Sequence, residues 1–199
     1  MRRRMMCVPM MILLLTLTAC GGSGEGSQAE QLALEIRGDY LDMTACNATM
    51  DVTADYGQRV YDYTIEAAYV KDGETTLTVT APEIIAGVTA RLSKDSTVLE
   101  YDGVCWETGA LNPDGMSPVD AIPALLAYAR EGFIAECGME TVNETELLRI
   151  VCRDPEGTAG AGEECSLWFA PDTHALLRGE LSQDGYTVIQ CVFSQFTMT

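Results

Sequence analysis

The sequence predicts an α+β protein built on an antiparallel sheet. Two stretches, at about residues 28–45 and 118–130, have the apolar spacing of amphipathic helices. Between and after them, short segments alternate apolar and polar side chains with the period of two that marks half-buried strands. Turn signals such as Asp102-Gly103 separate these segments and predict hairpins. A sheet with one apolar face needs a cover, and the two helices can supply it.

The chain begins with the pattern of a secretory signal. Arg2, Arg3 and Arg4 precede an apolar run from Val8 to Leu17, which is shorter than the roughly 20 residues that span a bilayer. A charged start, a short apolar core and a small residue before the cut are the features of a cleaved signal peptide. Residues 1–19 are therefore expected to be removed.

Cys20 ends this segment and is the predicted site of lipidation. Leu17-Thr18-Ala19-Cys20 resembles the lipobox of bacterial lipoproteins, in which the cysteine is diacylated and becomes the first mature residue. Two acyl chains provide the two signals that stable anchoring requires. Residues 20–27 then form a lipidated cysteine and a flexible Gly/Ser tether. The alternative is an ordinary signal peptide cut elsewhere, with Cys20 incidental.

These features place the protein at the cell membrane, lipid-anchored on the extracytoplasmic face, with a Gram-positive surface favoured slightly over a periplasm. The chain has 30 acidic against 12 basic residues, a net charge of −18, and the signal contains three of the arginines. Binding to nucleic acid requires a cationic surface, so the composition argues against it. Docking onto anionic headgroups is disfavoured for the same reason, which leaves the lipid on Cys20 as the membrane contact.

The elements of residues 28–199 follow a clear order. The first helix carries an apolar stripe interrupted by Gly38: Leu32, Leu34, Ile36, Tyr40, Leu41 and Met43. The second is capped by Ser117, has proline at its first position and ends before Gly132. Strand periodicity begins near residue 48 and continues over residues 61–69, 77–81, 88–92, 98–101 and 104–108 before the second helix, then 133–142, 146–152, 166–169, 176–182 and 186–196.

Six cysteines remain once Cys7 leaves with the signal and Cys20 is lipidated: Cys46, Cys105, Cys137, Cys152, Cys165 and Cys191. An even number outside the cytoplasm favours disulfides, and a hairpin across a Gly-rich loop would bring Cys152 close to Cys165. Free buried thiols are the main alternative. A zinc site is the third, although the chain has no CxxC spacing and a single histidine.

Three stretches carry a resemblance to a known family: the Tyr61–Ala81 hairpin followed by Pro82-Glu83, the Leu99–Gly103 turn, and the Trp168–Leu177 segment. Over residues 28–199 the chain resembles the LolA-like outer-membrane lipoprotein carriers and their lipoprotein relatives, although no arginine motif matches the acyl-binding residues of the carriers. The resemblance implies a strongly curved antiparallel sheet, an incomplete β-barrel, covered by two or more helices. It also implies an apolar interior that binds acyl chains in the carriers and serves lipid transport or protein partnering in some relatives.

Ten apolar side chains are candidates for lining that interior: Tyr61, Tyr63, Tyr69, Leu77, Val79, Leu92, Trp106, Leu125, Trp168 and Leu177. The mouths of barrels are favoured ligand sites, so this set predicts binding of a lipid or another apolar ligand. The alternative is that the same residues form a filled core. The domain would then be an anchored interaction module, a partner or chaperone of another envelope protein.

The sequence favours a protein without catalytic activity, cofactor or metal. Its one histidine, His174, lies beside Asp172 and Thr173 in a predicted turn. No phosphate loop, HExxH or GxSxG motif occurs. Cysteines that are oxidised or buried are poor nucleophiles.

Replacing the lipobox cysteine tests the anchor. We expect the Cys20→Ala protein to accumulate as unprocessed precursor or to be shed, because it cannot receive acyl chains. Separation of cells into membrane and soluble fractions, with mass measurement of the N-terminus, distinguishes these forms. A variant that stays membrane-bound and is processed normally would contradict the lipoprotein assignment.

Overall fold

The computed structural model describes residues 25–110 and 115–199, so the predicted signal peptide and Cys20 lie outside the described residues. Its framework is one antiparallel sheet of eleven strands with two α-helices, α1 (Glu25–Asp42) and α2 (Ala121–Glu131), and a short 3₁₀ helix, η1 (Glu83–Ile85). The strands are β1 (Ala45–Asp55), β2 (Val60–Val70), β3 (Thr75–Ala81), β4 (Thr89–Leu92), β5 (Thr97–Tyr101), β6 (Val104–Gly109), β7 (Ile134–Val142), β8 (Thr145–Arg153), β9 (Glu163–Phe169), β10 (Leu176–Gln183) and β11 (Tyr186–Met198).

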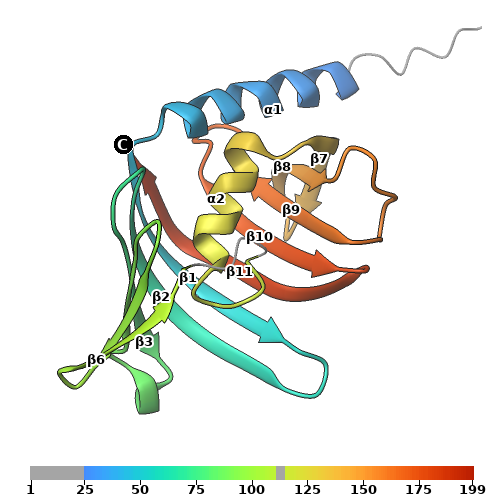
Figure 1. Cartoon of the computed structure of the whole chain (residues 1–199). Helices are drawn as coiled ribbons and strands as arrows, with labels where there is room; N and C mark the ends of the chain where they lie inside the picture. The colour runs from blue at the N-terminus through green and yellow to red at the C-terminus, as the bar shows by residue number, and fades with distance from the viewer. Residues whose placement is uncertain (1–24, 111–114) are drawn as a thin grey trace, which may run out of the picture.

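The strands form two meanders joined by their first and last members. The order across the sheet is β6-β5-β4-β3-β2-β1-β11-β10-β9-β8-β7, and β1 pairs with both β2 and β11. The sheet bends strongly around α2, and its edge strands β6 and β7 do not pair with each other (Figure 1). This arrangement confirms the predicted class, an α+β protein with a curved, incomplete barrel covered by two helices.

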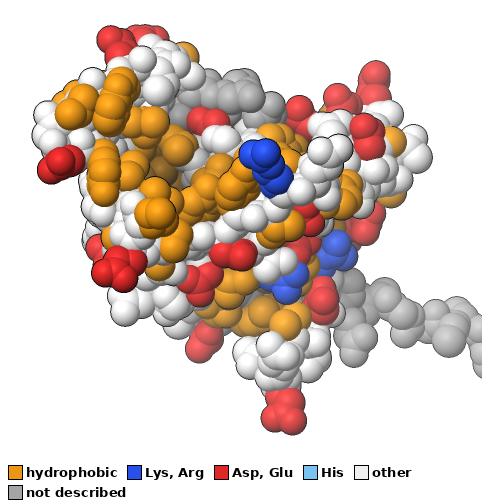
Figure 2. All heavy atoms as spheres, turned by 90° about the horizontal axis from the view of Figure 1, so that it is seen from below, with side chains coloured by type: hydrophobic (Ala, Val, Ile, Leu, Met, Phe, Trp, Pro, Cys, Tyr) orange, Lys and Arg blue, Asp and Glu red, His pale blue; other side chains and the backbone are white. Residues whose placement is uncertain are grey.

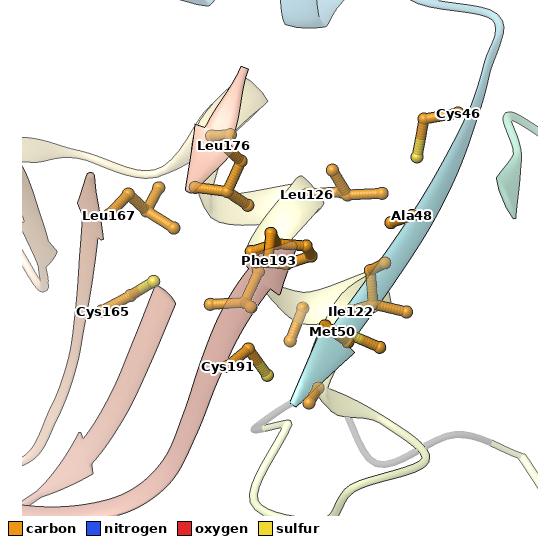
Figure 3. Close-up of a cluster of buried hydrophobic side chains, with 14 of the residues drawn as sticks. Cys46, Ala48, Met50, Ile122, Leu126, Cys165, Leu167, Leu176, Cys191 and Phe193 are labelled. Carbon is orange, nitrogen blue, oxygen red and sulfur yellow. The ribbon is translucent and has the colours of Figure 1, made fainter. Parts of the chain in front are cut away.

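The period of two seen in the sequence decides which face of the sheet is buried. In β1 every second side chain is at most 5% exposed, and the residues between them are not buried. These buried residues are Cys46, Ala48, Met50, Val52 and Ala54. They lie on the concave face, where they meet apolar residues of α2 and the other strands in one core (Figure 3).

Helix α2 lies on the concave side of the sheet and supplies the centre of this core (Figure 1). Ile122, Leu125 and Leu126 are fully buried. The helix begins at Ala121 and not at the predicted residue 118, because Ser117 forms a turn with Asp120 that precedes it. The Ser117 hydroxyl donates to the Asp120 carboxylate at 2.6 Å and accepts the Asp120 N–H at 3.3 Å.

Helix α1 begins earlier than predicted and buries only part of the predicted stripe. Residues 25–27, which the sequence assigned to the tether, are its first turn. The helix ends at Asp42 because the chain then enters β1, where the N–H groups of residues 44 and 45 donate to the Thr199 carbonyl. Leu34 and Leu41 of the predicted stripe are 64% and 44% exposed. Ile36 and Tyr40 of the predicted stripe are buried, and together with Ala29 and Ala33 they form a buried stripe with helical spacing.

The two helices are joined at the C-terminal end of α2. The Arg37 guanidinium of α1 donates to the carbonyl oxygens of Ala129 and Gly132. These carbonyls belong to a helix end, where intrahelical partners are missing and a cation is favoured. Tyr40 packs edge-on against Phe169 of β9, with ring centroids 5.3 Å apart. The α1 helix is therefore attached both to α2 and to the sheet.

The contact between α2 and β10 provides a test of this packing. A Cβ at Gly179 would lie 2.6 Å from both Cδ atoms of the fully buried Leu125. We expect Gly179→Ala to lower the free energy of unfolding by about 1–3 kcal/mol through overpacking, and Leu125→Ala to lower it by about 2–5 kcal/mol through the cavity it leaves. The double variant should lose less than the sum, because each change relieves the other.

Urea unfolding of the four proteins measures the coupling. Gly138→Ala in β7 is the matched control, since a Cβ there meets no atom within 4 Å. Additive effects of the Gly179 and Leu125 changes would show that the two sites do not pack against each other.

Candidate functional site

A continuous apolar row crosses the concave face from the centre of the sheet to its β6 edge. The pairing register places six residues side by side on successive strands: Ala48, Ala67, Leu77, Ala90, Leu99 and Trp106. The first four are 3–5% exposed, Leu99 is half-buried and Trp106 is 51% exposed. The row therefore starts in the core and ends in solvent.

The inner end of the row is covered by α2. Figure 3 shows Ile122 and Leu126 of the helix above Ala48 and Met50 of β1. The covering side chains are completely buried, so this part of the half-barrel is filled. The open part begins on the strands that lie beyond the helix.

The outer strands expose apolar side chains on the same concave face. Val104 is 49% exposed and Tyr61 39%, and the Tyr56, Tyr61 and Tyr63 rings contact one another in sequence with centroid separations of 6.3 and 6.4 Å. Seen from below, hydrophobic side chains surround a hollow on the side of the molecule formed by these strands (Figure 2). Burial raises the pKa of Tyr56 and of Tyr63, so both hydroxyls remain neutral under ordinary conditions.

The concave face of β2–β6 carries no charge on its strand residues. All the acidic side chains of these strands alternate onto the convex face: Asp62, Glu66, Glu100 and Glu107. Arg91 is on the convex face as well, where it pairs with Glu100 at 3.1 Å. An apolar ligand on the concave face would not have to desolvate a charge from the strands.

A cavity of about 690 Å³ lies at the opposite end of the same strands, between α2 and two turns. Its lining residues are Tyr69, Val70, Asp72, Gly73, Thr75, Leu92, Ser93, Lys94, Asp95 and Pro123. Arg130 of α2 donates to the Tyr69 hydroxyl at 2.8 Å and stands over its ring, with 5.5 Å to the centroid. The volume is within the range of small-molecule sites, and the rim is polar while the wall is apolar.

Seven of the ten predicted lining residues lie together on the concave face of β2, β3, β4 and β6: Tyr61, Tyr63, Tyr69, Leu77, Val79, Leu92 and Trp106. Leu125 is in the filled core beside β10. Three further residues of this surface, Leu99, Val104 and Tyr56, were not singled out from the sequence. Leu99 and Val104 could have been found from the two-residue Asp102-Gly103 turn. This turn fixes the register of the hairpin, with Leu99 opposite Trp106 and Tyr101 opposite Val104.

Trp168 and Leu177 lie away from this surface. Trp168 is the cross-strand partner of Arg149 and of Arg178 on the convex side. The guanidinium carbons of these two arginines lie 5.4 and 5.0 Å from the centroid of its ring. The indole N–H donates to the Glu140 carboxylate at 3.0 Å. Its low exposure of 6% comes from this stack and not from the core. Leu177 occupies the irregularity between Leu176 and Arg178. Neither Trp168 nor Leu177 therefore lies with the seven predicted residues on the concave face of β2–β6.

The described cysteines are all free thiols. Cys152 and Cys165 are direct cross-strand partners and both are buried, so the hairpin brings them together, and a disulfide between them stays a prediction. Burial raises the pKa of Cys46 and of Cys191 to about 12, and that of Cys152 to about 11. Cys105 is exposed.

His174 lies in the turn between β9 and β10, as predicted. Its Nδ1 is 2.6 Å from an Asp39 carboxylate oxygen, and the Tyr40 hydroxyl donates to its carbonyl at 3.1 Å. These contacts hold α1 to the turn. Within residues 25–110 and 115–199, no three His, Cys, Asp or Glu side chains form a group able to hold a metal ion. No helix in this part of the chain has the length and apolar character needed to cross a membrane.

Fold and site together define a half-barrel whose concave face is filled under a helix and open and apolar beyond it. No protein-family model matches the chain, and no curated protein matches its sequence. Similar solved structures include an uncharacterized conserved protein from Thermus thermophilus, with a TM-score of 0.51 and 11% identity over 86% of this chain and 88% of that one.

Two other similar structures have TM-scores below 0.5. A putative outer membrane lipoprotein-sorting protein domain from Vibrio parahaemolyticus has a TM-score of 0.46 and 10% identity, covering 87% of this chain and 92% of its own. A LolA superfamily protein from Nitrosomonas europaea has a TM-score of 0.39 and 13% identity, covering 88% and 94%. At 11% identity, the likeness to the Thermus thermophilus protein concerns the fold alone.

The buried thiols predict a loss of stability at alkaline pH. Their folded-state pKa values lie above the ordinary 9.0, so the unfolded chain releases these protons first as the pH rises. The stabilising effect is complete below about pH 9 and is lost as the pH rises toward 11–12, by up to about 1.4 kcal/mol per pH unit for each thiol.

Urea unfolding between pH 7 and 11 measures this slope. We expect Cys191→Ala to reduce it, and the exposed Cys105→Ala control to leave it unchanged. Equal slopes in the two variants would show that burial of Cys191 does not govern its ionisation.

Proposed function

We propose that this protein is a lipid-anchored extracytoplasmic lipoprotein that binds a lipid acyl chain or another elongated apolar ligand on the concave face of β2–β6, without catalysing a reaction. The observation that carries the proposal is the apolar row that runs from buried Ala48 to exposed Trp106. Soluble proteins rarely leave a contiguous apolar surface open unless something binds to it.

The dimensions of the helix explain why the surface stays open. Eleven residues of α2 make a rod about 17 Å long. Six strands from β1 to β6 span about 24 Å at the usual spacing of neighbouring strands. The helix is too short to cover this width in any orientation. An apolar ligand would take the place that a longer helix occupies in a closed core.

The tyrosines at the open end suit a ligand with one polar end. Tyr56, Tyr61 and Tyr63 combine apolar rings with hydroxyl groups that can hydrogen-bond. The uncharged strand positions favour the apolar portion. The Tyr56 hydroxyl donates to the Met116 carbonyl at 3.1 Å, so the Tyr61 and Tyr63 hydroxyls are the donors for an ester or carboxyl group at the polar end.

The predicted alternative, an interaction module with a filled core, describes only the part beneath α2. The exposure of Trp106, Val104 and Tyr61 favours ligand binding over a wholly filled interior. Two observations also favour a binding role over catalysis. His174 lies in the β9–β10 turn, away from β2–β6, and contacts the Asp39 carboxylate of α1. Burial keeps the four buried cysteine thiols protonated, which makes them poor nucleophiles.

Tryptophan fluorescence can test the site directly, because the chain has two tryptophans and they lie on opposite faces. In a Trp168→Phe protein, Trp106 is the single reporter. We expect a dibrominated fatty acid to quench its emission and shift it to shorter wavelength. The Trp106→Phe protein, which keeps only the stacked Trp168, is expected to show no change.

A pair of valine variants locates the binding surface. Val104→Asp places a charge on the open concave face and is expected to weaken binding at least tenfold, which corresponds to about 1.4 kcal/mol. Val192→Asp is the matched control, since Val192 is 41% exposed on the convex side of β11. Quenching of both tryptophans alike, or equal loss in the two aspartate variants, would contradict the proposed site. Native mass spectrometry of the purified protein would show whether a lipid accompanies it.

A further inference from the structure

The outer edge of β6 pairs with no strand of the described sheet. β6 is the last strand of the sheet, and all six of its residues are exposed. Such an edge presents unpaired backbone groups to another strand, and proteins usually protect it with charge, a bulge or a cover. Glu107 is the one charged residue of β6.

The opposite edge, β7, shows these protections. It carries Glu136 and Glu140, and α1 packs against it (Figure 1). An irregularity in the pairing with the neighbouring strand occurs at both edges, so the cover by α1 is the main difference between them. Within the described part of the chain, the β7 edge of the sheet is therefore covered by a helix, whereas the β6 edge is not. The difference singles out β6 as the edge on which a strand can add.

The hairpin that leads into β6 fixes which backbone groups face outward. Asp102 and Gly103 form a two-residue loop with φ of 50° and 75°, the geometry of a type I′ turn. The residues on either side of it, Tyr101 and Val104, then bond to each other. Because bonding alternates along an antiparallel strand, Cys105 directs its N–H and carbonyl away from β5. The same holds for Glu107.

We propose that this edge binds a second copy of the chain, with β6 of each copy antiparallel and Cys105 opposite Cys105, so that the two sheets continue into one another about a twofold axis. The strand is self-complementary in this register. Val104 of each copy faces Trp106 of the other on the concave side, which gives two pairs of a β-branched and an aromatic residue. Glu107 faces Gly103, and no two acidic residues are opposed.

Other registers are poorer. Centring the pairing on Glu107 would oppose two carboxylates. Centring it on Trp106 would place Val104 against Thr108, where the ladder with β5 is already irregular. The excess of acidic over basic residues opposes association at long range, but salt at 0.15 M screens this repulsion beyond about 8 Å. Dimerisation should therefore strengthen with ionic strength.

A proline at the centre of the edge tests the proposal. Cys105→Pro removes the one outward N–H on the twofold axis and leaves the bonds to β5 intact, since an edge strand tolerates proline when its N–H faces solvent. In sedimentation velocity at increasing protein concentration, we expect the wild type and the Cys105→Ala control to dimerise, and Cys105→Pro to weaken the dimer at least tenfold. Circular dichroism and retained quenching of Trp106 by the dibrominated fatty acid would show that Cys105→Pro is folded and keeps its concave face.

Oxidative cross-linking reports the register. Diamide accepts two electrons and two protons as two Cys105 thiols join in one S–S bond. Cα atoms about 5.5 Å apart in a hydrogen-bonded pair are within disulfide range, whereas the diagonal positions of the Trp106-centred register, about 7–8 Å apart, are not. A disulfide-linked dimer that is lost in Cys105→Ala is expected.

Three results would overturn the proposal. A wild type that remains monomeric at all concentrations and salt levels removes the dimer. A dimer that Cys105→Pro leaves unchanged places the interface elsewhere. A dimer that Cys105→Pro dissociates but diamide does not cross-link removes the Cys105-centred register.

Discussion

The pairing of β1 with β11 is the contact on which the rest of the half-barrel depends. Every other strand pair joins strands that are neighbours in the chain, whereas β1 and β11 are the first and the last strand. Between them, the Thr197 hydroxyl donates to the Asn47 carbonyl, 150 residues away in the sequence. The terminal Thr199 continues this ladder through bonds with the backbone of residues 44 and 45. Without this pairing the sheet would separate into two meanders, and the concave face would have no common curvature. Such a non-local contact is costly in chain entropy, so it is expected to form late in folding.

Helix α2 holds the two meanders together from the inside. Leu125 packs against Gly179 on one half, and Arg130 bonds to Tyr69 on the other. Arg37 then fixes the end of α2 to α1, which is itself tied to β9 by Tyr40 and Phe169. The angle between the two halves, and hence the width of the open face, is set by these few contacts.

Much of this fold could be predicted from local signals. Two-residue turns fix hairpin register, so Asp102-Gly103 alone places Leu99 beside Trp106. The errors arose where local patterns are ambiguous. Leu167, Trp168 and Phe169 form a continuous apolar run, and periodicity cannot say which of them faces the core. The arginines of the two neighbouring strands decide it by stacking on Trp168. Helix α1 buries Ile36 and Tyr40 of the predicted stripe, but it also buries the small Ala29 and Ala33 and leaves Leu34 and Leu41 exposed. The gradient of exposure along the apolar row depends on where a helix from elsewhere in the chain ends, which no local pattern contains.

The strand period that buries the core also separates charge from apolar surface on the open half. On the convex side, Asp51 and Asp62 accept hydrogen bonds from Thr64 and Thr53 at 2.8 Å, which gives that face a polar network in contact with water. On the concave side, the strand residues of β2–β6 carry no charge at all. A shift of one residue in any of these strands would bring a carboxylate into the concavity and turn an apolar side chain out to solvent. An acidic protein can thus keep a surface suited to an uncharged ligand, because alternation along each strand assigns the two properties to different faces. The acidity disfavours adsorption to anionic membranes through the convex face.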